Sequence, residues 1–422
     1  MGWETWETSS PEGKLLWATC SALWLALFCL AAHSINLAEP FLPLAIAGGF
    51  IFYFRSSPRV LELVAWIFLS AGFTALVHFP RENNWTNTGS GVLAMFGLGA
   101  FCMLGLRWLW SAPLARRRAY AMFAPGAAAV FFVFSAQRAL NLGSLLYPKT
   151  FDLYLFVVDG SLGFQPSFLI GRAMSASVLL KIPAALAYIS LPFVMALVYA
   201  LHLPKGTERP SWDIVTLFLL AGIGGWVLYN LVPATGPGYV FGRDFPWHSL
   251  PYAVLPKLAL ERIPVPTDVP RNAMPSLHMA WAVLLFWNTK GFSRAIRIFM
   301  FVFLLLTMVA AIGVGEHYFV DLVAGLPFAL FVQAVVWPGE KPAFSQRAIT
   351  AATGLGLTLA WMLLVRFGAQ WMLISPILPW ALIVATTTTV WIFRVRSSAS
   401  PKSSPQTNDT APPQSLAFGA HG

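Results

Sequence analysis

The chain has 422 residues, of which 57% are hydrophobic and 10% are charged, and its mean hydropathy is +0.67. These values exclude an ordinary soluble domain and indicate a membrane protein that crosses the bilayer several times. The net charge of +10 is not accompanied by a patch of interleaved basic and aromatic residues, so the sequence does not favour a nucleic-acid partner.

Apolar runs about 20 residues long follow one another along the chain, the length that a helix needs to cross a hydrocarbon core roughly 30 Å thick. The runs are continuous and do not alternate with polar residues, which favours helices over a closed barrel of strands. We therefore predict an all-α, polytopic integral membrane protein with about twelve transmembrane helices, at residues 15–34, 38–54, 60–79, 90–110, 119–137, 183–203, 212–232, 276–289, 296–314, 317–337, 348–366 and 374–394. No small-residue cleavage site follows the first run, so we interpret it as a retained span and not as a signal peptide.

Basic residues divide unevenly between alternate connections. Ten of the 27 Lys and Arg residues fall on one side, most of them in two long loops, 138–182 and 233–275. The other side carries seventeen: Lys14, Arg55, Arg59, Arg107, Arg116, Arg117, Arg118, Lys205, Arg209, Lys290, Arg294, Arg297, Lys341, Arg347, Arg394, Arg396 and Lys402. Because positively charged connections stay in the cytoplasm, we predict that both termini are cytoplasmic and that both long loops face the periplasm, exterior or lumen.

The chain divides into four predicted regions. N-terminal transmembrane helices occupy 1–118, a central membrane region occupies 119–340, and C-terminal transmembrane helices occupy 341–396. The tail over 397–422 is rich in Ser, Pro and Thr and poor in apolar residues, so we expect it to be disordered and cytoplasmic. The three cysteines lie inside predicted spans and are interpreted as packing residues: Cys20, Cys29 and Cys102.

The stretch GVGEHYFVDLVAGL places His317 and Asp321 four residues apart at the predicted non-cytoplasmic end of a helix. This spacing puts them on one helix face, where the carboxylate can accept a hydrogen bond from one imidazole nitrogen and leave the other free and basic. Such a pair suits a nucleophile or general base, whereas the alternative is a buried polar pair that fixes helix packing. His278 lies at the same end of another predicted helix, 39 residues upstream, so we expect the three side chains to meet.

The stretch PRNAMPSLHMAW marks the start of that other helix, because Pro275 suits the first helical turn. The N–H groups of Ser276, Leu277 and His278 would then point into the exported loop and, with the helix dipole, form a site for phosphate oxygens. The Ser276 hydroxyl would add a further hydrogen bond, and the Arg271 guanidinium could bind phosphate through two hydrogen bonds. This cluster therefore predicts phosphate chemistry.

PSLH at 275–278 followed by HYFVD at 317–321 resembles the second and third motifs of the type 2 phosphatidic acid phosphatase superfamily, which usually read PSGH and SRxxxxxHxxxD. The sequence departs from this pattern in two places: Ala310 and Ala311 replace the Ser and Arg of the third motif, and there is no KxxxxxxRP first motif. With the stretch YNLVPATGPG, these departures make the chain most similar to the inositolphosphotransferase branch, which includes inositol phosphorylceramide synthases. The resemblance implies a six-helix catalytic membrane domain over 119–340.

The resemblance also implies a mechanism. His317 would attack phosphorus to form a phosphohistidine, Asp321 would hold the imidazole ring, and His278 would protonate the leaving oxygen. Water or an acceptor alcohol would then take the phosphoryl group with His278 as the base. No cofactor and no metal ion is needed in this scheme, because the N–H groups and Arg271 would supply the charge stabilisation. Three more basic residues of the same loop are weaker candidates for the missing family Lys and Arg: Arg243, Lys257 and Arg262.

These observations predict an enzyme of the plasma or inner membrane that acts on a phospholipid or lipid phosphate. A phosphotransferase and a phosphatase of lipid phosphates or polyprenyl diphosphates would use the same residues. A transporter with a His/Asp proton relay is the alternative from another class, although the sequence shows no internal repeat and its polar groups gather at helix ends.

The segment from Phe151 to Arg172 is apolar but is interrupted by two aspartates, Asp152 and Asp159, and by Pro166. We interpret it as an interfacial segment that lies along the exported surface near the site. Asp159 is a less favoured candidate for a catalytic acid.

Overall fold

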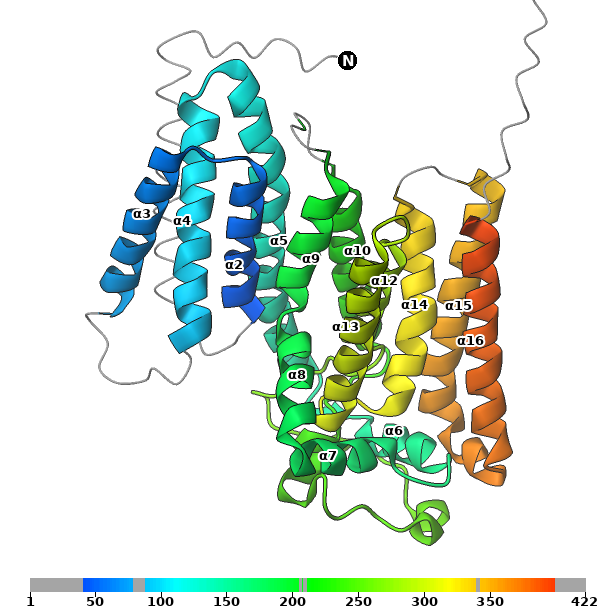
Figure 1. Cartoon of the computed structure of the whole chain (residues 1–422). Helices are drawn as coiled ribbons and strands as arrows, with labels where there is room; N and C mark the ends of the chain where they lie inside the picture. Colours follow the sequence, from blue (N-terminus) through cyan, green and yellow to red (C-terminus); the bar gives the residue numbers. More distant parts are fainter. Residues whose placement is uncertain (1–40, 79–87, 205–206, 208–210, 339–341, 399–422) are drawn as a thin grey trace, which may run out of the picture.

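The computed structural model describes residues 41–78, 88–204, 207, 211–338 and 342–398 (Figure 1). Helices make up nearly all of its regular structure, as the continuous apolar pattern predicts. Most run side by side, while α6 (Asp152–Gly160) and α7 (Pro166–Ala176) lie across one end of the bundle. The predicted span 15–34 and most of the predicted tail lie outside the described residues.

Four of the described helices precede α6: α2 (Phe41–Arg55), α3 (Val60–His78), α4 (Thr88–Trp110) and α5 (Pro113–Leu146). The helix α4 packs against both α2 and α3. Gly97 on α4 makes the close approach to α2 possible, because a Cβ at this position would lie 2.0 Å from the carbonyl oxygen of Ile46. The helix α5 is longer than the predicted span 119–137 because it begins at Pro113, a residue well suited to a first turn.

The predicted span 183–203 is divided into two helices, α8 (Val178–Ile189) and α9 (Leu191–His202). Pro192 lies in the first turn of α9, where it needs no hydrogen-bond partner, but it prevents the α8 hydrogen-bond pattern from continuing. The axes of α7 and α8 differ by 115°, so the chain turns here from the end of the bundle into its body.

The remaining elements are α10 (Asp213–Tyr229), α11 (Pro237–Phe241), η1 (Gly242–Asp244), η2 (Tyr252–Lys257), α12 (Leu277–Trp287), α13 (Arg294–Gly313), α14 (Phe319–Val336), α15 (Phe344–Gly368), η3 (Ala369–Ile374) and α16 (Ile377–Ser398). The all-α prediction misses one feature, a two-residue antiparallel pairing of β1 (Lys149–Thr150) with β2 (Ile263–Pro264). This pairing joins the start of α6 to the long loop before α12 and satisfies backbone groups that neither segment can pair alone.

Six of the described helices are long and apolar enough to cross a membrane: α4, α5, α13, α14, α15 continued by η3, and α16. We therefore treat the chain as an integral membrane protein. The predicted count of about twelve spans is not confirmed, because other apolar helices, such as α2, α9, α10 and α12, are shorter. The helix α12 is short because Ser276 caps its start, and because the Asn288 side chain at its end donates to the carbonyl of Leu284.

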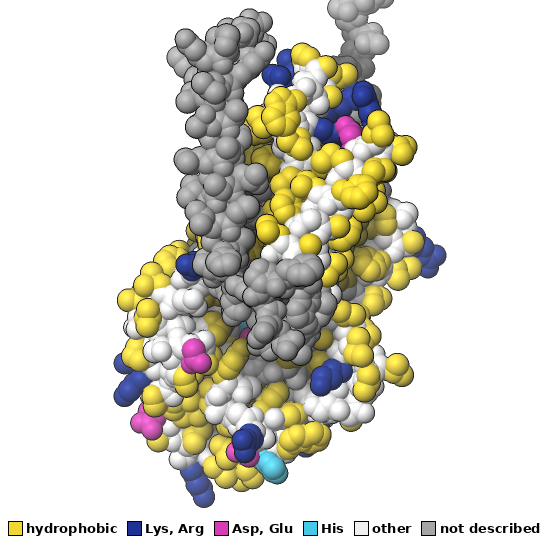
Figure 2. Space-filling model, turned by 90° about the vertical axis from the view of Figure 1, so that its left-hand side faces the viewer, with side chains coloured by type: hydrophobic (Ala, Val, Ile, Leu, Met, Phe, Trp, Pro, Cys, Tyr) yellow, Lys and Arg dark blue, Asp and Glu magenta, His cyan; other side chains and the backbone are white. Residues whose placement is uncertain are grey.

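The connections alternate between the two ends of the bundle (Figure 1). The ends of α2, α4, α9, α12 and α14, from which the predicted cytoplasmic connections leave, lie at the upper end of this view. The short helices α6 and α7 and the loop between α10 and α12 lie at the lower end. Figure 2 shows hydrophobic side chains over much of the described surface on one face of the molecule, with Lys and Arg side chains toward both the upper and the lower end. The membrane side that each end faces stays a prediction.

Candidate active site

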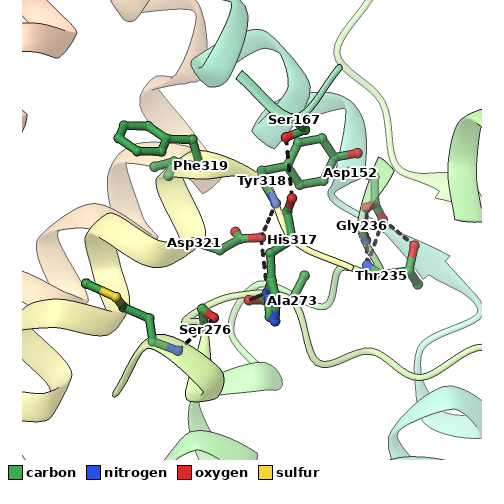
Figure 3. A network of polar contacts seen from close by, with 12 residues as sticks. Asp152, Ser167, Thr235, Gly236, Ala273, Ser276, His317, Tyr318, Phe319 and Asp321 are labelled. Carbon is green, nitrogen blue, oxygen red and sulfur yellow. Dashed lines mark hydrogen bonds and ion pairs between the residues drawn. The ribbon is translucent and has the colours of Figure 1, made fainter. Parts of the chain in front are cut away.

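His317 lies in the short connection between α13 and α14 and is almost completely buried, with 1% of its surface exposed. Its backbone N–H donates to the carbonyl of Ala311 at the end of α13, which fixes the main chain. In the side chain, Nδ1 lies 2.9 Å from the carbonyl oxygen of Ala273 (Figure 3). A carbonyl can only accept, so Nδ1 carries the proton and Nε2 is the basic nitrogen. Among the described residues, Nε2 has no hydrogen-bond partner.

Asp321 lies beside this ring but does not form the hydrogen bond that the spacing suggests. Its Oδ2 is 3.6 Å from His317 Nδ1, too far for a hydrogen bond, although close enough to stabilise a positive imidazole. The same oxygen accepts the N–H of Tyr318 at 2.7 Å as part of a capping box at the start of α14. The Asp321 carbonyl also accepts the N–H of Ser276 at 2.9 Å, which ties α14 to the start of α12.

Ser276 is the N-cap of α12, and its hydroxyl accepts the N–H of Met279 at 3.4 Å. Pro275, which we expected in the first turn, therefore lies just before the helix. Because the Ser276 N–H is bonded to Asp321, the predicted group of three N–H donors is reduced to those of Leu277 and His278. These are the first two N–H groups of the helix and have no acceptor within it. The Tyr229 hydroxyl lies beside the Leu277 N–H. Phosphate binding at these donors stays a prediction.

His278 meets His317 as predicted, although 39 residues separate them in the sequence. The two imidazole centroids are 5.7 Å apart. The ring of His278 is stacked on Tyr188 of α8 with centroids 3.8 Å apart, and Phe41 at the start of α2 lies 5.5 Å away. These aromatic contacts fix the position of the His278 ring beside His317.

Arg271 is buried and its donors point to backbone carbonyls. Its guanidinium donates to four carbonyls, those of Tyr147, Val265, Pro266 and Val269, over 2.6–3.1 Å. Four of its five N–H groups are therefore engaged in holding the loop before α12 against the end of α5. A phosphate contact through Arg271 stays a prediction that only the last N–H can serve. Burial lowers the pKa of Arg271, which nevertheless stays protonated at neutral pH.

Two aspartates of α6 belong to the same region, of which the sequence suggests only Asp159, as a less favoured catalytic acid. Asp159 accepts the N–H groups of Phe319 and Val320 at 2.7 and 2.9 Å. Asp152 accepts the N–H of Gly236 at 2.8 Å. Both aspartates are buried, although we expected their segment to lie along the surface. Burial raises the pKa of Asp159 to about 7 and raises the pKa of Asp152 from its ordinary value.

A sequence signal for this pair does exist. Two carboxylates seven residues apart in an apolar helix lie on the same face of that helix. Burial of a carboxylate costs free energy unless it accepts hydrogen bonds, so such a pair indicates hydrogen-bond donors on the neighbouring segments. The three weaker basic candidates of the loop are exposed: Arg243, Lys257 and Arg262. No group of three His, Cys, Asp or Glu side chains within the described ranges has the arrangement of a metal site.

Most of the residues described above, with Asp152 as an exception, lie within the part of the chain that matches a family model. Residues 153–335 match the model of the PAP2 superfamily. The match begins in α6, ends in α14 and covers less than half of the chain, and it supports an activity of the phosphatase or phosphotransferase type. The inositolphosphotransferase branch is not confirmed by it. No curated protein and no solved structure matches the chain.

Proposed function

We propose that the protein is a phosphotransferase of the membrane that moves a phosphorylated group between lipids through a phosphohistidine. The observation that carries the proposal is the buried His317, whose Nδ1–H is bonded to a carbonyl and whose Nε2 is unpartnered among the described residues. A neutral imidazole with a fixed Nδ1 proton presents a lone pair at Nε2, which is what a nucleophile requires. The second histidine, His278, lies close enough to serve the leaving oxygen.

The reaction takes two steps. In the first, the Nε2 lone pair of His317 forms a bond to phosphorus, the bond from phosphorus to the leaving oxygen breaks, and protonated His278 gives that oxygen its proton. In the second, an acceptor hydroxyl bonds to phosphorus, its proton passes to the now neutral His278, and the bond from phosphorus to nitrogen breaks. Asp321 stabilises the positive imidazole formed in between, and the N–H groups of Leu277 and His278 stabilise the phosphate oxygens.

Burial favours transfer to an alcohol over hydrolysis. His317 is 1% exposed and His278 8%, so bulk water does not surround the phosphohistidine. A site that excludes water protects a reactive intermediate until a lipid hydroxyl arrives. We therefore place head-group transfer of the inositol phosphorylceramide synthase type ahead of a lipid phosphatase.

The test is an assay of the purified full chain in detergent with phosphatidylinositol, phosphatidic acid and a polyprenyl diphosphate, each with and without ceramide or diacylglycerol. We expect a phosphorylated acceptor product and an acid-labile phosphoprotein. His317→Ala should abolish both, and His278→Ala should lower turnover by about 10²–10⁴-fold, as expected for loss of a general acid. Free phosphate as the sole product would indicate a phosphatase, and full activity in His317→Ala would contradict the proposal.

We further propose that the site faces the periplasm, exterior or lumen. Ser249 and Ser293 are both exposed, and they lie in loops at opposite ends of the helices. A membrane-impermeant thiol reagent applied to intact cells should label Ser249→Cys and leave Ser293→Cys unlabelled. The reverse pattern would place the site in the cytoplasm.

A further inference from the structure

The helix α6 contacts the candidate site through two buried carboxylates on one of its faces. Asp152 is 0% and Asp159 1% exposed, and they stand seven residues, close to two helical turns, apart. Neither side chain points to solvent, and neither takes part in the reaction proposed above. Each instead accepts hydrogen bonds from a different backbone segment that adjoins His317.

Asp159 holds the segment on the C-terminal side of His317. Its two oxygens accept the N–H groups of Phe319 and Val320, which are the first two of α14 and have no acceptor inside that helix. The Ser167 hydroxyl lies 3.4 Å from Asp159 Oδ2 and 3.4 Å from the carbonyl oxygen of His317 itself. The Asp159 carboxylate therefore fixes the start of α14 at its positive end, and thereby the position of His317, which directly precedes this turn.

Asp152 holds the segment that packs on the N-terminal side of His317. It accepts the N–H groups of Thr235 and Gly236 and the Thr235 hydroxyl (Figure 3). Gly236, with φ of +104°, lies so close to this side that a Cβ would be 2.4 Å from the carbonyl oxygen of Glu316. Two residues before Gly236, the Ala234 carbonyl accepts the N–H of Ala273.

The Ala273 carbonyl is the acceptor of the His317 ring proton, so this chain of contacts ends at the imidazole. Asp152 therefore acts on the ring through Thr235, Ala234 and Ala273, while Asp159 acts on the backbone on the other side. The two carboxylates together constrain both the position of His317 and the direction in which its ring points.

We propose that α6 is a positioning helix, in which Asp159 and Asp152 hold His317 so that Nε2 points at the phosphorus atom of the substrate. This inference rests on the proposed role of His317 as the nucleophile. In-line attack needs the reacting atoms at near contact distance, and a displacement of about 1 Å can lower the rate by about 10²-fold. A carboxylate suits the task because it accepts two N–H groups at once, whereas an amide has only one oxygen.

The test compares three substitutions in the purified full chain, with kcat and KM measured on the substrate found by the assay above. Asp159→Asn keeps the shape but loses one acceptor oxygen, and we expect kcat to fall about 10-fold with KM within about twofold of the wild type. Asp159→Ala should lower kcat further, by about 10²-fold. Ser167→Ala, which removes only the hydroxyl between Asp159 and His317, should lower kcat by a few-fold.

The matched control is Gln165→Ala. Gln165 is buried beside the same helix and donates to the Phe156 carbonyl, but its bond does not reach the His317 segment. We expect this variant to lose thermal stability while kcat stays within about twofold of the wild type. A similar loss of kcat in Gln165→Ala would mean that any weakening of α6 lowers activity, and would overturn the positioning role.

The outcome is separable from that of the proposed function. Full activity in His317→Ala removes the nucleophile and the proposed function with it. Loss of activity in His317→Ala together with unchanged kcat in Asp159→Asn and Ser167→Ala overturns the positioning role alone. If Asp159→Ala does not fold, these two milder variants decide the matter.

Discussion

The helices α12 and α14 both begin at the candidate site, but the side chains that bond to their first N–H groups differ in charge. At the start of α14, the N–H groups of Phe319 and Val320 bond to the Asp159 carboxylate, and Asp321 caps Tyr318. At the start of α12, the cap is the neutral hydroxyl of Ser276 and the first turn has no acidic residue.

This difference assigns a task to each helix. The positive end of α14 is already matched by protein carboxylates, so it has no place for a further anion and serves to hold His317. The positive end of α12 is not neutralised by a carboxylate of its own, so it is suited to the negative oxygens of a phosphate. Proximity to the site alone therefore does not make a helix terminus a ligand site; the charge that the protein has already placed there decides it.

The largest expected effect comes from making α12 resemble α14. Ser276→Asp keeps an acceptor at the N-cap, but Ser276 is fully buried, so burial of the new charge should lower thermal stability. The new carboxylate would face the substrate phosphate, and because opposed like charges cost several kcal/mol, KM should rise by about 10²-fold. Steady-state kinetics of the purified variant measure this change.

The control for that substitution is Ser276→Thr, which keeps a neutral capping hydroxyl and should leave KM within a few-fold of the wild type. An unchanged KM in Ser276→Asp would show that the phosphate binds elsewhere, and would contradict the phosphate-binding role of the start of α12.

The next effect concerns Arg271, which holds the loop that leads into α12. Arg271→Ala leaves buried carbonyls without donors, and because each such group costs about 1–3 kcal/mol, the free energy of unfolding should fall by about 3 kcal/mol or more. Thermal unfolding in detergent should show a large drop, and Arg271→Lys should recover only part of it. The opposite result, unchanged stability with a raised KM, would restore the phosphate-binding role that the sequence predicts.

The smallest expected effect is the pH dependence of stability caused by Asp159. Burial raises its pKa to about 7 from 3.8, so the folded chain binds this proton more tightly than the unfolded chain. The resulting stability is complete below the unfolded pKa and is lost as pH rises through about 7. The melting temperature of the wild type should therefore fall between about pH 5 and about pH 8, and less so in Asp159→Asn. Identical slopes in the two proteins would assign the effect to another group.

The extra C-terminal helices also support the site, a role that the sequence did not suggest. The helices η3 and α15 contact α6, and α15 packs along α14. The Trp380 indole of α16 donates to the Leu162 carbonyl between α6 and α7, and Arg366 of α15 donates to the Leu231 carbonyl after α10. These contacts stabilise α6, the helix that we propose to position His317, although the family match ends before α15 begins.

The sequence by itself determined the membrane class, the order of the apolar helices and the meeting of His278 with His317. It could do so because the length of an apolar run is a local property of the chain, and because the alternation of spans puts the starts of the two helices that carry His278 and His317 at the same end of the bundle. The predicted number of full spans is not confirmed among the described residues, since the breaks at Ser190 and at the start of α12 depend on single residues within otherwise apolar runs.

Only the tertiary structure decided which groups are partners. The His317 ring donates to a carbonyl 44 residues away, Arg271 Nε to one 124 residues away, and Asp159 accepts an N–H 160 residues away. Backbone carbonyls and N–H groups are present at every residue, so the sequence contains no sign of which one a buried side chain will meet. That choice follows from how the helices pack, and it turned Arg271 into a loop anchor and the two aspartates of α6 into parts of the site.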